Sequence, residues 1–309
     1  MTDRSQPPSA PTLATDTSPQ DARPERLAHT FPRPGSSLYH ALKVVPAQQR
    51  APLETWLTWW HETALIPYEV RDPGVAEQKL TWWLSELKRA EQGQAQHPLL
   101  QRVKAFTLLP NAPTWPEWPL WSQQIEGLIQ LVHQTRWLDD GSLQRHARQT
   151  TGAAAESAAV LLGATSDAAR SAANLLGVGL RQAHQLGRLG QDARAGWVNV
   201  AIDVLQTHDV KAHQLTRPDA QQVPAGWSAL LGHLHAQAHA TLDQGLSAIR
   251  ALSRAEQRAL KPLLVLAHIQ LAQMAAVAQS GDLVLHQRIV LTPLMKSWIS
   301  QKVRWGLLK

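Results

Sequence analysis

One segment of the chain, KLTWWLSELKRAEQGQAQHP at residues 79–98, constrains its fold more than any other. Apolar side chains recur there at intervals of three and four residues, at Leu80, Trp83, Leu84 and Leu87. This spacing places them on one face of a helix and predicts that the face is buried. Gly93 and Pro98 then interrupt the pattern, so we expect the helix to end in the turn that contains them.

Helical patterns continue along most of the chain. Further helices are predicted within residues 53–60, 125–132, 166–189, 227–234 and 260–274. Residues 152–162 form an alanine-rich pattern, and alanines also gather at 168–173. Such small side chains let helices approach closely, so we expect both segments in the middle of a bundle. No segment alternates between apolar and polar residues as a strand does, and the sequence therefore predicts an all-α fold.

The composition is that of a folded domain without covalent cross-links. Apolar residues make up 44 % of the 309 positions, which is ample for a hydrophobic core. The chain contains no cysteine, which excludes disulfides and thiolate chemistry. The net charge of +6 is mild, and Lys and Arg are dispersed along the chain, so no nucleic-acid partner is expected.

The first 35 residues differ from the rest of the chain. They hold seven prolines and few large apolar side chains, so residues 1–35 are predicted to be a disordered tail and residues 36–309 the folded domain. The tail lacks the apolar core of a signal peptide, and its aspartates argue against a transit peptide. No run of about 18 apolar residues predicts a transmembrane helix. The default localisation is cytoplasmic, and peripheral contact with a membrane stays open.

Tryptophan is unusually frequent, with thirteen residues against two Tyr and two Phe. Eight of the thirteen lie in one third of the chain: Trp56, Trp59, Trp60, Trp82, Trp83, Trp115, Trp118 and Trp121. Most of these follow helical spacing, which favours a tryptophan-rich core. The alternative is a lipid-binding cavity or a rim that faces a membrane.

Residues 79–98 resemble a block of the squalene/phytoene synthase family, in which a K-L-x-W-W helix ends in a G-x-P-x-H-P turn. Further segments resemble that family in the same order: LYHALKVVP at 38–46, IEGLIQLVHQTRW at 125–137 and LGRLGQDARAG at 186–196. Residues 259–296 resemble its closing helix pair with a basic, strand-like tail. The resemblance implies the isoprenoid synthase fold, a single all-α bundle around a central cavity.

The resemblance also implies a chemistry, the head-to-head condensation of two prenyl diphosphates. Two aspartate-rich motifs face each other across the cavity, each with carboxylates four residues apart on one helix face. They hold Mg²⁺, a cation that prefers carboxylate and phosphate oxygens. The metal neutralises the diphosphate and helps it to leave.

The sequence departs from the family pattern in the first motif. The family's C-R-E-x-D-D-x-x-D-E aligns with residues 60–69, where Ala64, Leu65 and Tyr68 stand in place of aspartates and His61 in place of arginine. Pro67, in the same stretch, removes a helical hydrogen bond and is predicted to kink the helix. The first metal-binding motif is therefore predicted to be lost.

The second motif is altered as well. Arg188 and Gln191 stand where the family has an aspartate and a glutamate, and Asp192 remains. His184 stands in place of the family's asparagine. Three other positions of the family's cavity are occupied by Leu131, His146 and Arg148. One carboxylate next to an arginine is not expected to hold a magnesium cluster, so no catalytic residue and no cofactor are assigned.

Two functions stay open. In the first, the chain is a catalytically degenerate member of the family that binds a lipid, an isoprenoid or a partner protein. In the second, it is an enzyme, a prenyltransferase that condenses farnesyl or geranylgeranyl diphosphate with Mg²⁺ in squalene, hopanoid or carotenoid synthesis. A variant of the second is a silent subunit that works with a catalytic paralogue. The altered motifs favour the first.

The predicted ligand is anionic, because basic side chains have entered the old metal positions. The candidate ligand-binding residues are His61, Arg181, His184, Arg188, Asp192 and Arg194. A guanidinium can contact phosphate oxygens without a bridging metal. Two simpler interpretations remain: these residues drifted once catalysis lapsed, and Asp192 with Arg194 forms a salt bridge at a helix end.

Three histidines at 233, 235 and 239 include a pair four residues apart, a spacing that can bind zinc. No third ligand lies near them in the sequence, and their neighbours are those of a solvated helix face. No zinc site is therefore predicted.

Overall fold

The computed structural model describes residues 31–219 and 222–308. Within these residues it contains α-helices, one π-helical turn and no strand, which confirms the predicted all-α fold. Most of the tail predicted at residues 1–35 lies outside the described residues, so its disorder stays a prediction. Residues 31–35 form bends and a turn that lead into the first helix.

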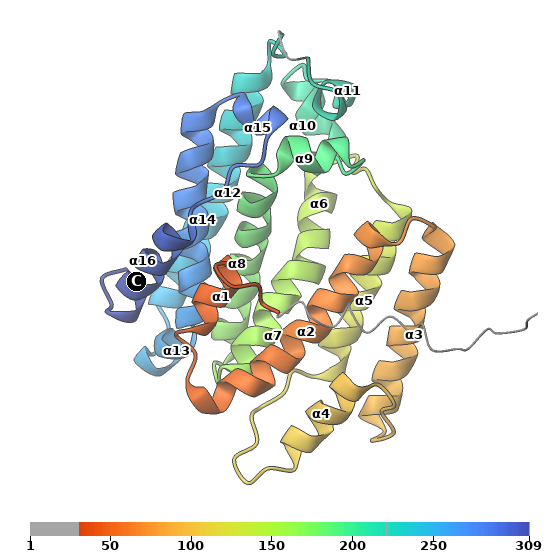
Figure 1. Cartoon of the computed structure of the whole chain (residues 1–309), viewed down its shortest axis with the longest axis vertical. Coiled ribbons are helices and arrows are strands. Elements are labelled where there is room, and N and C mark those ends of the chain that lie inside the picture. Colours follow the sequence, from red (N-terminus) through yellow and green to blue (C-terminus); the bar gives the residue numbers. More distant parts are fainter. Residues whose placement is uncertain (1–30, 220–221, 309) are drawn as a thin grey trace, which may run out of the picture.

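Sixteen α-helices follow one another in the described residues, with the π-helical turn η2 (Arg148–Gly152) between the sixth and the seventh. They are α1 (Ser37–Leu42), α2 (Ala47–Glu69), α3 (Pro73–Glu91), α4 (Pro98–Thr107), α5 (Trp118–His133), α6 (Asp140–Ala147), α7 (Ala153–Leu161), α8 (Asp167–Leu186), α9 (Leu189–Arg194), α10 (Ile202–Thr207), α11 (Ala212–Thr216), α12 (Trp227–Arg250), α13 (Arg254–Ala259), α14 (Lys261–Ser280), α15 (Leu283–His286) and α16 (Pro293–Arg304). Figure 1 shows them stacked into one elongated bundle.

Helix α3 contains the segment that anchors the sequence analysis. It starts at an N-cap, where the Asp72 carboxylate accepts a hydrogen bond from the Val75 amide at 3.0 Å. Leu80, Trp83 and Leu87 are buried as predicted. The helix ends at Glu91, and Gly93 follows with a φ of 74°, a conformation that favours glycine. The predicted helix and its glycine stop are confirmed.

Tryptophans fill the core between α2, α3 and α5. Trp56, Trp59, Trp83 and Trp121 are buried in one cluster of apolar residues. The rings of Trp59 and Trp121 pack with centroids 4.4 Å apart, and Trp56 meets Trp121 edge-on at 6.4 Å. Edge-on and offset contacts are the favoured arrangements of aromatic rings. The core interpretation is therefore confirmed for these four, while Trp82 is exposed.

A second core lies between α8, α12 and α14 and depends on small residues. A Cβ atom on Gly245 would lie 2.9 Å from the Cα of Leu176, and one on Gly179 would lie 3.0 Å from the backbone nitrogen of Leu242. Both glycines therefore allow α8 and α12 to pack at short range. Ala172 is buried on α8, as predicted for an alanine-rich helix in the middle of the bundle.

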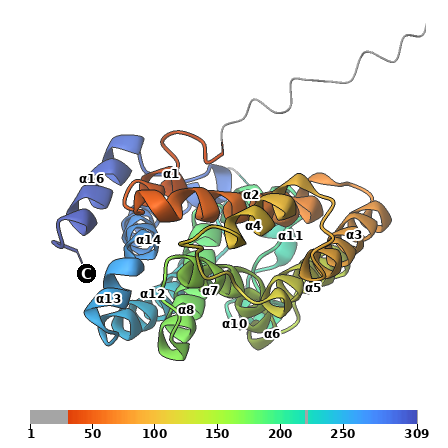
Figure 2. The same cartoon turned by 90° about the horizontal axis from the view of Figure 1, so that it is seen from below.

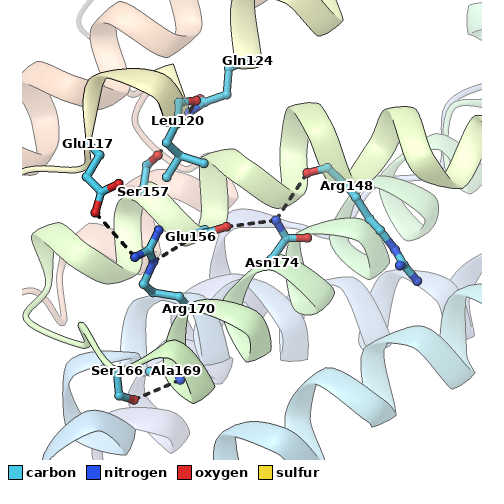
Figure 3. A network of polar contacts seen from close by, with 10 residues as sticks. All are labelled: Glu117, Leu120, Gln124, Arg148, Glu156, Ser157, Ser166, Ala169, Arg170 and Asn174. Atoms are coloured by element: carbon cyan, nitrogen blue, oxygen red, sulfur yellow. Dashed lines mark hydrogen bonds and ion pairs between the residues drawn. The ribbon is translucent and has the colours of Figure 1, made fainter. Parts of the chain in front are cut away.

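Polar contacts fix α7 against its neighbours (Figure 3). The guanidinium of Arg170 on α8 donates to Glu156 on α7 at 2.9 Å, and the Asn174 amide donates to the same carboxylate at 3.2 Å. On the other side of α7, the amide of Gln124 donates to the Ser157 hydroxyl at 3.1 Å. These contacts hold α7, and with it the preceding turn η2, between α5 and α8.

One helix of the described chain, α14, is long and apolar enough to cross a membrane. Half of its most apolar window is buried inside the protein, where it packs against α1, α8, α12 and α16. The core helix of a bundle has the same length and composition, so α14 is weak evidence for a membrane span.

The C-terminal segment differs from the predicted strand-like tail. Residues 287–292 have no regular structure, and Pro293–Arg304 forms the helix α16, which starts at Thr292 as its N-cap. Pro293 at the first helical position suits a helix start because its missing N–H has no partner there. Both views place α16 at the edge of the bundle, beside α1 and α14 (Figures 1 and 2).

Candidate ligand-binding site

The last turns of α2 carry the segment that the sequence analysis aligned with the family's first aspartate-rich motif. Ala64 and Leu65 are half-buried, and Tyr68 is exposed. The helix continues through Pro67 to Glu69. The ring of Tyr68 packs against that of Trp197, with centroids 4.7 Å apart. None of these three side chains offers a carboxylate to a metal ion.

Arg181 on α8 lies where the two altered motifs meet. Burial lowers the pKa of its guanidinium, and the Tyr68 hydroxyl and the Asp192 carboxylate oppose that shift. Its Nη1 lies 3.4 Å from the Oγ1 atom of Thr150, a weak contact. Its Nε and Nη2 atoms are buried without a hydrogen-bond partner. A buried donor without a partner costs stability, so this guanidinium is poised to bind an acceptor.

The π-helical turn η2 supplies Thr150. The hydroxyl of Thr150 donates to the carbonyl of His146 at 2.8 Å, so its oxygen can accept from Arg181. A π-helical turn carries an extra residue and is frequent at functional sites. No pattern in the sequence predicted it.

His184 lies one turn after Arg181 on α8. Burial lowers the pKa of its imidazole, as do the positive charges of Arg188, Arg288, Arg181 and Lys296, and together they bring it to about 4. The ring is nevertheless exposed to solvent. The lowered pKa and the exposure are compatible if the side chain lies in a recess, where protein atoms surround the ring but water still reaches part of it. His184 is therefore neutral near pH 7.

Arg188 and Asp192 form an ion pair at α9. The Nη2 atom of Arg188 lies 3.0 Å from Oδ1 of Asp192, four residues along the chain. The side-chain amide of Asn199 lies 3.5 Å from the other carboxylate oxygen. The remaining carboxylate of the second motif is therefore already occupied by a cation of the same motif. Gln191 is exposed between them.

Two further cations complete the site, and the sequence analysis missed both. Burial lowers the pKa of Arg288, as does the charge of Arg188, while Asp192 raises it. Burial and the charge of Arg288 lower the pKa of Lys296 on α16. We call Arg181, His184, Arg188, Arg288 and Lys296 the basic cluster. The one available signal was the abundance of Lys and Arg after residue 283, where no acid occurs.

The structure does not bring His61 into the basic cluster. Its ring stacks on that of Phe31, with centroids 4.2 Å apart and an interplanar angle of 20°. Burial lowers its pKa, Glu69 raises it, and Arg33 lowers it. The predicted ligand-binding residue therefore faces the segment that precedes α1.

Arg194 also has another role. Its guanidinium donates to the carbonyl oxygens of Leu285 and His286, the second at 2.9 Å. It therefore caps the C-terminal end of α15, as basic side chains commonly do. The salt bridge predicted between Asp192 and Arg194 is wrong, because Asp192 pairs with Arg188.

His146 and Arg148 occupy altered positions but do not join the basic cluster. His146 is buried, its Nε2 lies 2.9 Å from the carbonyl of Gly127, and burial together with the charge of Arg181 lowers its pKa to about 4. The side chain of Arg148 is exposed, and Figure 3 shows it directed away from the labelled residues of α7 and α8. The basic cluster therefore does not include His146 or Arg148, although the sequence analysis aligned both with positions of the family's cavity.

A cavity of about 50 Å³ adjoins Arg181 between α6, α8, α9 and α12. Its wall is mostly apolar, and at its polar end the Asp140 carboxylate accepts hydrogen bonds from the amides of Gln144 and Gln237, both at 2.6 Å. Sites for drug-sized ligands occupy about 300–1,000 Å³. The cavity therefore holds a few atoms and not a prenyl chain.

The side chains do not fit the Mg²⁺ that the family resemblance implies. Among the described residues, no group of three or more His, Cys, Asp or Glu side chains could hold a metal ion. Mg²⁺ needs several oxygen ligands, whereas the basic cluster presents nitrogen donors around one paired carboxylate. Of the histidines at 233, 235 and 239 on α12, His233 packs against His208, whereas the rings of His235 and His239 stack and His239 pairs with Asp243 at 2.9 Å.

Comparisons with known proteins agree with this fold. A dehydrosqualene synthase, solved in complex with a ligand, superposes with a TM-score of 0.68 at 14 % identity, over 88 % of this chain and 91 % of that one. Squalene synthase HpnC from Alicyclobacillus acidocaldarius gives 0.66 at 16 % identity, over 78 % and 88 %. YisP from Bacillus subtilis subsp. subtilis strain 168 gives 0.56 at 17 % identity, over 86 % and 89 %.

At these identities the structural matches establish a shared fold, and the activities named belong to the relatives. A search of curated proteins finds no match by sequence. The model of one protein family, described as squalene/phytoene synthase, matches residues 31–295, which is most of the chain. The chain belongs to the squalene/phytoene synthase family.

Proposed function

We propose that this chain is a catalytically inactive member of its family, and that it binds an anionic phosphate-bearing ligand without Mg²⁺. The ligand is a prenyl diphosphate or the headgroup of an anionic lipid, which share the chemistry of phosphate oxygens. The residues that bind it are Arg181, Arg188, Arg288 and Lys296. The observation that carries the proposal is the basic cluster at the junction of the two altered motifs.

The charges of the basic cluster support an anionic ligand. The charge of Arg188 lowers the pKa of Arg288, and the charge of Arg288 lowers the pKa of Lys296, so these two cations are destabilised by a neighbouring cation. The opposing carboxylate of Asp192 is shared among them. Like charges held together in a recess are unfavourable unless an anion neutralises them. Bound phosphate would supply that charge.

The geometry of Arg181 supports a direct contact with phosphate. Two of its guanidinium nitrogens are buried without a hydrogen-bond partner, the third has a weak contact with Thr150, and the nearby Tyr68 hydroxyl and Asp192 carboxylate interact with the group. A guanidinium offers parallel N–H donors that match two phosphate oxygens, and it needs no metal to do so. The role that Mg²⁺ has in the family is thus taken by side chains of this chain.

The small cavity beside Arg181 limits how much of a ligand's prenyl tail can be buried. About 50 Å³ does not accommodate a prenyl tail, so in this conformation the affinity comes from the phosphate group. Inorganic diphosphate is therefore expected to bind nearly as well as farnesyl diphosphate. A much stronger effect of farnesyl diphosphate would mean that the cavity opens around the tail.

Thermal unfolding with ligand and EDTA tests the proposal. Ligand binding to the folded state raises the melting temperature, by about 5 °C for a chain of this size at a ligand concentration of 100 times Kd. We expect this rise with inorganic diphosphate and with farnesyl diphosphate in the presence of EDTA. We expect Arg188→Ala to abolish it.

The matched control is Arg102→Ala, which removes an exposed arginine of α4 far from the basic cluster. It should keep the rise in melting temperature. A water-soluble short-chain phosphatidic acid provides the lipid comparison, read out by the melting temperature of the same two variants. No rise at millimolar diphosphate, or one that appears only with Mg²⁺, contradicts the proposal.

A further inference from the structure

The exposed apolar side chains of this protein gather in its C-terminal segment. Half of the large apolar side chains that are exposed in the described residues lie within residues 283–307. Five of them belong to α16 and the turn after it, and they are between 51 % and 81 % exposed: Leu294, Met295, Trp298, Trp305 and Leu307. Exposed apolar residues that cluster in this way mark an interaction surface.

Helix α16 has two different faces, one packed against the bundle and one exposed. Ile299, Ser300 and Val303 are buried against the bundle, and the Ser300 hydroxyl donates to the carbonyl of His40 at 3.0 Å. The spacing of Leu294, Trp298 and Trp305 places these side chains together on the outer face. The helix is therefore fixed on one side and presents apolar groups on the other.

Two tryptophans dominate the outer face. The rings of Trp298 and Trp305 meet edge-on with centroids 6.0 Å apart, and the ammonium of Lys302 lies 5.4 Å from the centre of the Trp298 ring. Tryptophan favours the boundary between lipid and water, where an apolar ring and a polar N–H are both satisfied. A lysine beside it can extend its ammonium to the headgroups.

A basic groove adjoins this face. It has a volume of about 290 Å³ and lies between the end of α12, α13, the start of α14 and the C-terminal turn. Its wall combines apolar side chains with four cations and no acid, and the cations are Arg250, Arg254, Arg258 and Lys261. Figures 1 and 2 show α13, α14 and α16 along the same side of the bundle.

The charge of the C-terminal segment favours a negatively charged partner. Residues 283–309 contain five Lys or Arg and no Asp or Glu. A second copy of the chain would bring the same basic surface into the contact, and like charges would repel. An anionic bilayer instead attracts nearby Lys and Arg and accepts exposed Trp and Leu side chains.

We infer that the outer face of α16 and the adjoining groove form a docking surface for an anionic membrane. Leu294, Trp298 and Trp305 enter the headgroup region, and the cations of the groove contact lipid phosphates. We call this the C-terminal surface. It is separate from the basic cluster and does not depend on the proposed function.

Vesicle co-sedimentation of the full chain tests the inference. We expect binding to vesicles of phosphatidylcholine with about 30 % phosphatidylglycerol, and binding that is weaker by about tenfold or more to pure phosphatidylcholine. Trp298→Ser with Trp305→Ser, and separately Arg254→Glu with Arg258→Glu, should each weaken binding by about tenfold or more. All four side chains are exposed, so the variants should fold, and circular dichroism checks this.

Matched controls use exposed residues of α3, which lies on the opposite side of the bundle from α16 (Figures 1 and 2). Trp82→Ser removes an exposed tryptophan, and Lys79→Glu with Lys88→Glu changes the net charge as much as the arginine variant does. Both should bind vesicles like the unaltered chain.

Three results would overturn the inference. The first is equal binding by the tryptophan variant and by Trp82→Ser. The second is binding that ignores the anionic lipid. The third is a dimer, detected by light scattering, that dissociates in Trp298→Ser with Trp305→Ser while the vesicles stay unbound; the C-terminal surface would then be a contact between copies.

Discussion

Incubation of this protein with farnesyl or geranylgeranyl diphosphate and Mg²⁺ is expected to yield no squalene, no phytoene and no cyclopropyl intermediate. The reason lies where the two altered motifs meet. Ala64, Leu65 and Tyr68 offer no carboxylate, and Asp192 is paired with Arg188 at 3.0 Å. Without bound Mg²⁺, the departing diphosphate loses the charge stabilisation that its departure requires.

The expected effect on rate is large. A metal ion contributes several kcal/mol of transition-state stabilisation, and its absence lowers the rate by about five powers of ten. Extracted products can be separated by chromatography and identified by mass spectrometry. The baseline is Arg188→Glu, and a family member with intact motifs serves as the positive control. Product above that baseline would show that a rearranged site is active, which was the alternative function.

Local patterns were sufficient to predict the scaffold. Leu80, Trp83 and Leu87 recur at helical spacing because α3 buries one face, so their burial follows from the sequence alone. The alanines of α7 and α8 predicted a close-packed centre for a similar reason. Gly93 was identified as the helix stop because it interrupts the apolar spacing. The structure gives the physical reason: the φ there is positive, a conformation that disfavours most other residues.

The site could be predicted only in part, because it depends on contacts between distant segments. Arg188 was identified by its alignment with a family motif and Arg181 by its place one turn before His184, but Arg288 and Lys296 approach from about a hundred residues further along the chain. The role of Arg194 could not be predicted from its position in a motif, because that position does not say whether the side chain contacts a carboxylate or a backbone carbonyl. The π-helical turn that positions Thr150 has no compositional signal.

Glu86 shows the same limit in the scaffold. It lies three residues after Trp83, on the same face of the helix, but as a charged residue it was not expected to be buried, and its side chain is completely inaccessible. The carboxylate accepts hydrogen bonds from the amides of Gln96 and His97 at 2.5 and 2.6 Å and pairs with Arg89 at 2.7 Å. It thereby fastens the turn after α3, the feature that first linked this chain to its family.

The pKa of Glu86 reflects these contacts. Burial alone would raise it, but the hydrogen bonds from His97, Arg89 and Gln96 outweigh burial and lower the pKa below its usual value. A lowered pKa in the folded state means that the ionised carboxylate stabilises the fold above the ordinary carboxyl pKa. That contribution is lost as the pH falls through the folded-state pKa.

Glu86→Ala is therefore expected to lower the free energy of unfolding by about 3–5 kcal/mol near pH 7, because it leaves two amides and Arg89 without their buried partner. Glu86→Gln keeps an acceptor for the amides and should cost less. The control Glu91→Ala removes an exposed carboxylate of the same helix end and should have little effect.

Denaturant unfolding from pH 7 to pH 3 measures the free energy of unfolding of the unaltered chain and the three variants. The effects of buried histidines are common to all four proteins and cancel in the differences. The gap between the unaltered chain and Glu86→Gln should close as Glu86 protonates. A gap that stays constant down to pH 3, or a Glu86→Ala protein as stable as Glu91→Ala, would show that this carboxylate does not hold the turn.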